Sequence, residues 1–288
     1  MEPSTIAQPA QTVTAYNKRV LVVLPWQKQV NPITAFCAGR LMDSRRTASV
    51  LHFGDAFVAH SRNSCADVFL GSECEWMLTI DDDMVCPFGN AQWFKANTDF
   101  DFPDKFMGLN ALDRLIGHGK TLVGALYFGR HKRGAPMYAE GVNPAEAEYA
   151  RSGPHDLIKP TRWVATGCML IHRKVFEDIE KKFPRLARGA DKKGGQWFTS
   201  TEAGMLEKVA AVQAMLEQGA HNAEKSYKAH EMLTSVLAQA ASDNPLGAGE
   251  DVSFCFRARA AGHVPYVDMG LVCGHIGNYV YGPKNTKA

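Results

Sequence analysis

The sequence predicts an α/β fold in which a mainly parallel central sheet is flanked by helices. Short apolar runs without alternation, such as Val20–Leu24 and Trp76–Ile80, are typical of strands buried on both faces. These runs alternate with segments whose apolar residues recur at helical spacing, which is the pattern of parallel sheets. The 288 residues, 45% hydrophobic and 22% charged, suffice for a large core. We therefore expect one domain over 18–288 behind a flexible polar tail at 1–17.

The first part of the chain shows this alternation most clearly. Pro25 ends the first apolar run, and Pro32 stands early in the next segment, where a helix tolerates proline best. We expect strands at 20–24, 49–54 and 75–80, with helices at 31–46 and 59–72, the second ending near Gly71. Such parallel strands, joined by right-handed crossovers, bind ligands beyond their carboxyl ends. A ligand site is therefore expected just after residue 80.

The second part of the chain continues the pattern and interrupts it once. Before residue 200 we expect a helix at 106–120, a buried strand at 121–130, a turn-rich hairpin at 131–144, and a strand, turn, strand and helix over 161–183. Near the end of the chain we expect a helix at 250–262 ended by Gly262, a strand at 263–270 and an irregular tail from 271. Residues 201–241 are dominated by Ala, Glu, Lys, Leu and Met and predict a helical insertion at about 199–243. Its apolar stripe predicts packing against the sheet domain or against a second subunit in a homo-oligomer.

Charge and cysteine content narrow the classes of function. The net charge is +2, from 32 basic and 30 acidic residues, so the whole molecule has no strong field for nucleic acid or membrane. No apolar run approaches the roughly 20 residues of a membrane span, and the first residues lack a signal-peptide pattern, so we expect a cytoplasmic protein without a membrane partner. The seven cysteines include no CxxC pair, which favours reduced core cysteines over a zinc site.

Three consecutive carboxylates, Asp81, Asp82 and Asp83, follow the apolar run Trp76–Ile80. Like charges this close repel one another unless a cation lies between them. Oxygen ligands are those that Mg²⁺ and Mn²⁺ prefer, and strand alternation would direct Asp81 and Asp83 to the same side. The alternative is a solvated acidic turn. The position at the end of a buried strand favours a metal site.

The stretch "HSRNSCADVFLGSECEWMLTIDDDMVCP" resembles the segment of GT-A fold glycosyltransferases, especially family-2-like ones, in which an Arg-Asn helix precedes a strand ending in Asp-x-Asp. The similarity continues in order through "LVGALYFGR", "WVATGCMLIHRKVFEDI" and "GEDVSFCFRARAAGHVPYVDMGLVCGHIG". It covers about residues 19–183 and 246–279. The resemblance implies a GT-A (Rossmann-like) domain that transfers a sugar from a nucleotide-diphosphate donor, such as a UDP- or GDP-sugar, with Mn²⁺ or Mg²⁺ bound.

The resemblance also assigns roles to individual residues. Asp83 and the late His275 would bind the metal, and Asp81 would bind the metal or the donor ribose. Asp251, beside Glu250, would be the general base that deprotonates the acceptor hydroxyl. Each residue has a plainer alternative, since carboxylates stabilise a helix start and a histidine in a Gly-rich tail is often only a surface residue. Glycines beside His275 would allow the tail at 270–288 to close as a lid.

Further residues would surround the donor and the acceptor. The donor side would comprise Pro25 and Trp26 after the first strand as a base pocket, Arg62 on the phosphates or the carboxylates, Asp82, Tyr127 and Gly167. Trp26 could equally pack in the core. The acceptor side would comprise Thr166 and the basic group Arg130, Lys132 and Arg133, joined by a second basic loop at 181–195, although each loop could be only a solvated surface loop. Basic loops of this kind favour a hydroxylated base in DNA as one candidate acceptor, and a base in a duplex would have to be flipped out.

The sequence therefore predicts a metal-dependent glycosyltransferase acting on a hydroxyl acceptor. A sugar nucleotidyltransferase is the first alternative, but Leu24-Pro25-Trp26 stands where that class would carry a Gly-rich phosphate loop. A non-catalytic sugar- or metal-binding module is the second, because the acidic triplet alone would suffice for it.

Overall fold

The computed structural model describes residues 20–26, 29–41, 47–54, 57–98, 107–130, 137–139, 158–186, 194–198, 227, 230–231, 249–277 and 280–281. The strands are β1 (Val20–Trp26), β2 (Thr47–Gly54), β3 (Trp76–Ile80), β4 (Met84–Val85), β5 (Leu122–Leu126), β6 (Tyr138–Ala139), β7 (Ile158–Pro160), β8 (Trp163–Val164), β9 (Cys168–His172), β10 (Tyr266–Val272), β11 (Gly274–Ile276) and β12 (Val280–Tyr281). The helices are α1 (Pro32–Leu41), α2 (Val58–Gly71), α3 (Ala91–Asn97), α5 (Ala111–Gly117), α6 (Arg173–Lys182), the short 3-10 helix η3 (Pro184–Leu186) and α9 (Glu250–Ala260).

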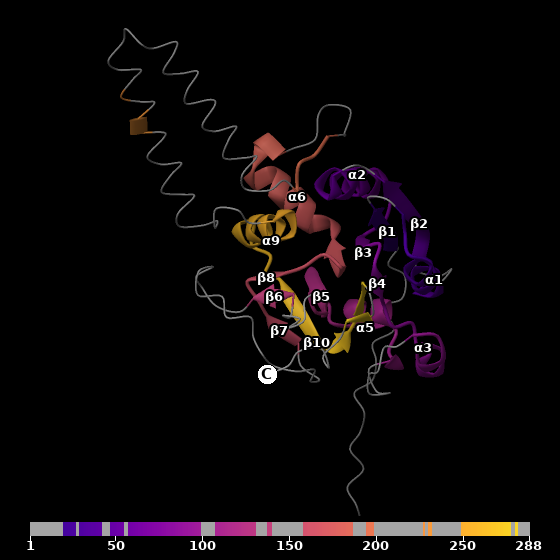
Figure 1. The fold of residues 1–288 in the computed structure, drawn as a ribbon. Coiled ribbons are helices and arrows are strands. Elements are labelled where there is room, and N and C mark those ends of the chain that lie inside the picture. The colour runs from indigo at the N-terminus through magenta and orange to yellow at the C-terminus, as the bar shows by residue number, and fades with distance from the viewer. Residues whose placement is uncertain are drawn as a thin grey trace, which may run out of the picture.

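The central sheet has seven strands in the order β2-β1-β3-β9-β5-β10-β7 (Figure 1). β1 is parallel to β2 and β3, β10 is parallel to β5, and β9 is antiparallel to both β3 and β5. Five strands therefore share one direction, while β9 and the edge strand β7 run the other way. The predicted α/β class is confirmed. The carboxyl ends of β3, β5 and β10 and the amino end of β9 consequently meet at one edge of the sheet.

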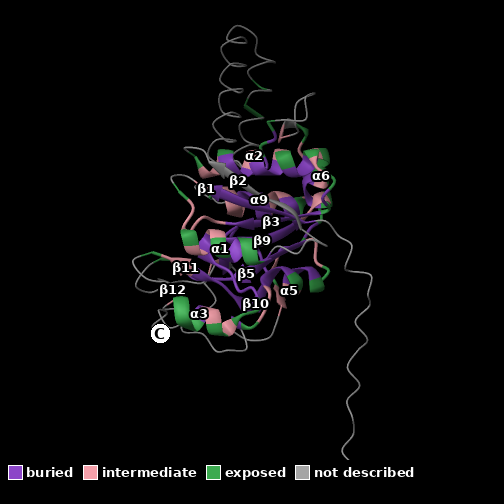
Figure 2. Ribbon diagram, turned by 90° about the vertical axis from the view of Figure 1, so that its right-hand side faces the viewer, coloured by how far each residue is buried: buried purple, intermediate pink, exposed green. Residues whose placement is uncertain are grey.

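The core lies on both faces of this sheet because its strands are apolar without interruption. Every residue of β3 and β5 is buried, as are Val20 to Pro25 of β1. Figure 2 shows the buried strands with α2 and α6 along one side, and α5 contacts β5, β9 and β10. Strands covered on both faces can bring polar side chains together only where they end. A functional site on this sheet is therefore expected at the strand ends.

Individual residues in the sequence predicted several helix ends correctly. α1 begins at Pro32, where the Asn31 side chain accepts a hydrogen bond of 2.9 Å from the Ile33 N–H. α2 ends at Gly71, as predicted. After α9, Gly262 adopts a left-handed conformation with a φ of 93°, and the next N–H, of His263, donates to the Ala258 carbonyl at 2.8 Å.

Other expectations need correction. β1 does not end at Leu24 but continues through Pro25 and Trp26, which pair with β2. The tail expected to be irregular from residue 271 instead completes β10 and forms β11, which pairs with β4 and β12. Pairing between strands remote in sequence, which no local pattern reveals, orders these residues.

A buried carboxylate shapes β10 where its register breaks. Asp268 is fully buried and accepts hydrogen bonds from Arg114 Nε at 2.6 Å and His118 Nε2 at 2.6 Å. Its Oδ1 also accepts the N–H groups of Gly270 and Leu271, which replaces ladder hydrogen bonds between Asp268 and Val272. Burial alone would raise the pKa of Asp268, but the hydrogen bonds from His118 and Arg114 lower it to about 2. The carboxylate thus holds the bulge that leads into β11.

Several expectations fall on residues that the structure does not describe. The tail at 1–17 and most of the hairpin at 131–144 and of the insertion at 199–243 lie outside the described residues. Of that hairpin, Tyr138–Ala139 form β6, which pairs with β8. None of the helices in the described part of the chain combines the length and apolar character that a membrane span requires.

Candidate functional site

The acidic triplet lies at the edge where the strand ends meet. The backbone N–H of Asp81 donates to the Gly167 carbonyl at 3.1 Å, just before β9. The Asp83 carbonyl accepts the N–H of Ile276 in β11 at 2.7 Å, and the Asp82 carbonyl accepts the N–H of Asn31 at 2.9 Å. Backbone hydrogen bonds therefore attach the triplet to three remote segments.

The triplet forms a turn and not the end of a strand, which corrects the alternation argument. β3 ends at Ile80, Asp82 and Asp83 are turn residues, and the N–H of Met84 donates back to the Asp81 carbonyl at 3.2 Å. In a turn the side chains do not alternate between two faces. The carboxylates of Asp81 and Asp83 consequently have different partners.

Asp83 faces His275. Nδ1 of His275 lies 2.9 Å from the Phe128 carbonyl oxygen, and Nε2 lies 3.4 Å from Oδ2 of Asp83. Because a carbonyl oxygen only accepts hydrogen bonds, Nδ1 carries a hydrogen, and in the neutral imidazole Nε2 then presents a lone pair. A lone pair opposite a carboxylate is repulsive unless a proton or a metal cation lies between them. The Phe128 carbonyl thus directs Nε2 of His275 at Asp83, the kind of hydrogen bond that also orients metal-binding histidines.

Arg130 also reaches Asp83. Its Nη2 lies 2.9 Å from Oδ2 of Asp83, while the Arg130 side chain is 52% exposed and that of Asp83 is 19% exposed. Exposed ion pairs of this kind contribute only about 0–1 kcal/mol, so a divalent cation at Asp83 can displace Arg130. Arg130 was expected on the acceptor side, and the structure pairs it with the predicted metal ligand.

Arg62 connects the triplet to the start of α9. Its guanidinium donates to both carboxylate oxygens of Asp81, at 2.8 and 2.9 Å, and to Oε1 of Glu250. Arg62 is only 6% exposed, its Nη2 contacts both oxygens of Asp81 while Nη1 contacts Glu250, and hydrogen bonds between charged groups of this kind are stronger than neutral ones. Burial alone would lower the pKa of Arg62, but the carboxylates of Asp81, Glu250 and Asp251 raise it above its usual range. Asp81 is therefore held by Arg62, away from the pair formed by Asp83 and His275.

Asp251, the predicted base, lies in surroundings that disfavour its negative charge. Burial raises its pKa from 3.8 to about 6, with smaller contributions from Glu250 and Asp81, and Arg62 and the Val252 N–H oppose the rise. Its Oδ1 accepts the Val252 N–H at 2.7 Å. Within the described part of the chain, this leaves Oδ2 to take up a proton. Glu250, by contrast, contacts Arg62 and helps to position it.

Tyr127 and Gly167 fit against each other. Tyr127 is 4% exposed, its hydroxyl accepts the Gly167 N–H at 3.0 Å, and its ring meets that of His275 edge to face at 5.6 Å. A Cβ at residue 167 would lie 2.5 Å from Cζ of Tyr127. Residue 167 must therefore be glycine because the Tyr127 ring lies against it. The sequence had suggested instead that the glycine makes room for the donor.

The residues present suit a hard divalent ion with few protein ligands. Asp81, Asp83 and His275 do not place three ligand atoms within 4.8 Å of one another, so the expected three-residue set is not assembled. Asp83 and His275 offer one oxygen and one nitrogen. Mg²⁺ and Mn²⁺ commonly bind through one or two protein groups and complete their coordination with water and substrate phosphates. The pair fits that requirement.

The remaining predicted residues are distributed unevenly. Pro25 is buried and Trp26 half-buried within β1, so neither follows the strand as expected. Thr166 is buried, and its hydroxyl has no hydrogen-bond partner in the described structure. Lys132 and Arg133 lie outside the described residues.

Sequence reasoning missed two features of this edge. The Phe128 carbonyl that orients His275 is a backbone atom, which leaves no signature in the sequence. The sulfur atoms of Cys86, Cys168 and Cys273 converge next to the site, although long stretches of chain separate the three residues and no motif spacing links them. All seven cysteines are buried free thiols in the structure, which confirms their predicted place in the core.

No family model matches the sequence, and no curated protein matches it. Among solved structures, the one titled "Crystal Structure of A197 from STIV" is similar, with a TM-score of 0.47 and 13% sequence identity over 93% of this chain and 91% of that one. What the chain does is therefore inferred from its own residues.

Proposed function

We propose that this protein is a metal-dependent glycosyltransferase of the GT-A type, which moves a sugar from a nucleotide-diphosphate donor to a hydroxyl group. The observation that carries the proposal is the pair of Asp83 and His275, with Nε2 of the imidazole directed at the carboxylate by the Phe128 carbonyl. The motifs that resemble such enzymes are far apart in sequence. Their gathering at the carboxyl edge of the sheet is the second support.

The residues at this edge would have different roles in the reaction. Asp83 and His275 would hold a Mn²⁺ or Mg²⁺ ion, which supplies Lewis-acid stabilisation of the charge on the departing diphosphate. Arg62 holds Asp81 and Glu250 in place, and Asp81 would contact the donor. Arg130 is exposed and weakly paired, so it is free to turn from Asp83 to a phosphate.

Asp251 would accept the proton of the acceptor hydroxyl. With a pKa of about 6, it is mostly ionised at neutral pH and is a stronger base than an ordinary aspartate. Transfer should therefore fall as the pH drops through about 6. The DNA acceptor suggested by the basic loops depended on both 130–133 and 181–195. Lys132, Arg133 and residues 187–193 lie outside the described residues, so the acceptor is proposed only as a hydroxyl group.

The test begins with donor binding and turnover. UDP- and GDP-sugars are screened by thermal shift with and without Mn²⁺, because a ligand that binds the native state raises its stability by RT ln(1 + [L]/Kd). Release of UDP or GDP from the matching donor is then measured with Mn²⁺ present. Asp83→Ala and His275→Gln should each abolish the Mn²⁺-dependent shift and the turnover, while the exposed Asp113→Asn, on α5, should leave both unchanged.

The outcomes separate the three classes of function. Release of nucleoside diphosphate that depends on Asp83 supports a transferase. Chemistry that requires pyrophosphate would instead indicate a nucleotidyltransferase, and binding without turnover would indicate a sugar-binding module. Asp251→Asn should bind the donor normally yet transfer poorly, and full transfer by this variant would exclude its role as the base.

A further inference from the structure

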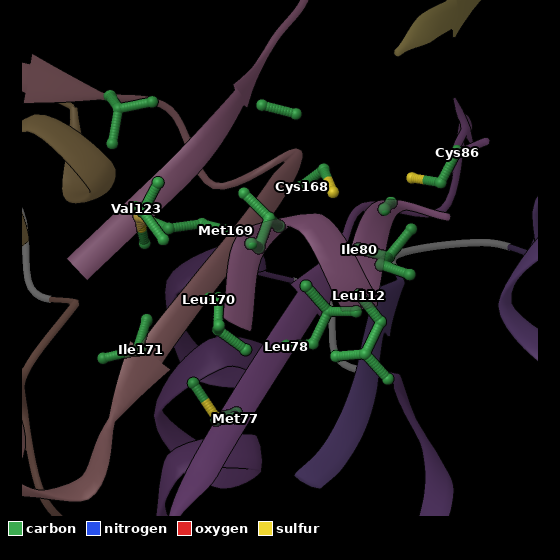
Figure 3. Packing of buried hydrophobic residues seen from close by; sticks show 14 of the residues in the cluster. Met77, Leu78, Ile80, Cys86, Leu112, Val123, Cys168, Met169, Leu170 and Ile171 are labelled. Carbon is green, nitrogen blue, oxygen red and sulfur yellow. The ribbon is translucent and has the colours of Figure 1, made fainter. Parts of the chain in front are cut away.

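Three cysteines that the proposed function does not use lie against the candidate site. Cys86 follows β4, Cys168 begins β9 and Cys273 follows β10, and all three are fully buried. Their sulfur atoms all lie within 4.8 Å of one another, and those of Cys86 and Cys273 are 3.7 Å apart. Figure 3 shows the sulfur atoms of Cys86 and Cys168 directed toward each other.

We propose that Cys86, Cys168 and Cys273 bind one thiophilic metal ion, Zn²⁺ or Cu⁺, at a structural site. Thiolate ligands select these ions over Mg²⁺ and Mn²⁺, so this site differs in chemistry from the pair of Asp83 and His275. Binding converts three thiols to thiolates: three sulfur–metal bonds form, and the three protons leave to solvent.

The spacing of the sulfur atoms fits such an ion. With a metal–sulfur bond of about 2.3 Å, two sulfurs of a tetrahedral site lie about 3.8 Å apart. The 3.7 Å between Cys86 and Cys273 matches this value. The other two sulfur pairs lie no more than 4.8 Å apart, so each exceeds this value by at most about 1 Å.

Ordinary core packing accounts less well for the arrangement. A buried thiol usually behaves as a small apolar group or donates to a backbone carbonyl, as Cys255 does to Val164 at 3.4 Å. The three sulfurs face one another, and thiols are weak donors and weak acceptors, so their mutual contacts contribute little. A metal ion would replace these contacts with coordinate bonds.

The three-cysteine metal site would stabilise the sheet edge that carries the candidate functional residues. Cys168 directly follows Gly167, Cys273 lies two residues before His275, and Cys86 lies three residues after Asp83. An ion joining the three sulfurs would set the spacing of these segments. The inference rests on the sulfur geometry alone and does not depend on the proposed function.

Charge and coordination number favour different ions. Three thiolates exceed the charge of Zn²⁺ by one and that of Cu⁺ by two, and excess buried charge is costly, which favours Zn²⁺. Structural Zn²⁺ usually takes four ligands, whereas three sulfurs suffice for Cu⁺, which favours copper. The two ions are therefore tested in separate arms.

The experiment uses the full chain, unfolded and refolded under reducing conditions with Zn²⁺ or with Cu⁺, because a site without solvent access fills during folding. After removal of free ions, metal per chain is measured by mass spectrometry. We expect about one ion in the wild type and less than about a tenth of that in Cys168→Ser. Cys65→Ser, a matched change of another buried cysteine, should retain the ion. Refolding with Co²⁺ should give a thiolate-to-cobalt absorption band in the wild type that is lost in Cys168→Ser.

Three results would overturn the proposal. One is a folded wild type that retains neither ion and shows no thiolate band with Co²⁺. Another is a Cys168→Ser variant that keeps as much metal as Cys65→Ser. The third is loss of the ion in His275→Gln, which would assign it to the other site. If Cys168→Ser does not fold, the metal content and the Co²⁺ band of the wild type decide the question.

Discussion

Replacing Asp251 by Asn should stabilise the protein near neutral pH while impairing its proposed activity. Asp251 is ionised at neutral pH in surroundings that disfavour its charge, as its raised pKa shows. Asn keeps the oxygen that accepts the Val252 N–H at 2.7 Å and removes only the charge and the ability to take up a proton. The variant therefore isolates the cost of holding a charged base in place.

The magnitude follows from the difference in pKa between the two states. A rise from 3.8 to about 6 on folding corresponds to about 3 kcal/mol, at about 1.4 kcal/mol for each pKa unit. Between these values the unfolded chain has lost the proton that the folded chain still holds, so stability falls as the pH rises. The cost is absent below about pH 3.8, is about 1 kcal/mol at about pH 4.5, and is complete, at about 3 kcal/mol, by about pH 7.5.

The assay is urea denaturation of wild type and Asp251→Asn at several pH values across this window. The stability advantage of the variant should grow by about 2 kcal/mol between about pH 4.5 and about pH 7.5. Glu177→Gln, an exposed position inside α6, serves as the matched control, since a surface substitution of this kind changes stability by less than about 0.5 kcal/mol. An advantage that does not grow with pH, or a variant less stable than wild type near neutral pH, would refute the reasoning.

Three further predictions concern packing and buried charge. Arg62→Met should lower the free energy of unfolding by about 3 kcal/mol, because its two carboxylate partners lose their counter-charge. Urea denaturation measures this, and a loss below about 1 kcal/mol would contradict it. Gly167→Ala should cost about 1–3 kcal/mol through its clash with the Tyr127 ring, and an unchanged thermal midpoint would mean that the ring has room to move. Asp268→Asn should be destabilising by about 3 kcal/mol at neutral pH. Because the pKa of Asp268 is lowered to about 2, its contribution is present above 3.8 and lost as the pH falls toward about 2, so the acid-unfolding curves of variant and wild type should converge there.

Features of the fold that depend only on residues close together in the sequence were predictable from it. Uninterrupted apolar runs identified β1, β3 and β5. Gly71 and Gly262 marked helix ends because a helix stops where its last carbonyls need a cap. The same reasoning could not find β11, whose residues pair with β12 and with β4, the latter some 190 positions earlier in the chain.

The candidate site divides in the same way. The sequence by itself determined that three carboxylates follow a buried strand and that an aspartate stands near the start of a later helix, because chain position and residue type suffice for both. Only the tertiary structure decided that Arg62 pairs with Asp81 and that His275 faces Asp83. It also decided that the sulfur atoms of Cys86, Cys168 and Cys273 lie close together. These contacts join residues from different strands and helices. Their geometry follows from the order in which the sheet assembles its strands, which no local pattern specifies.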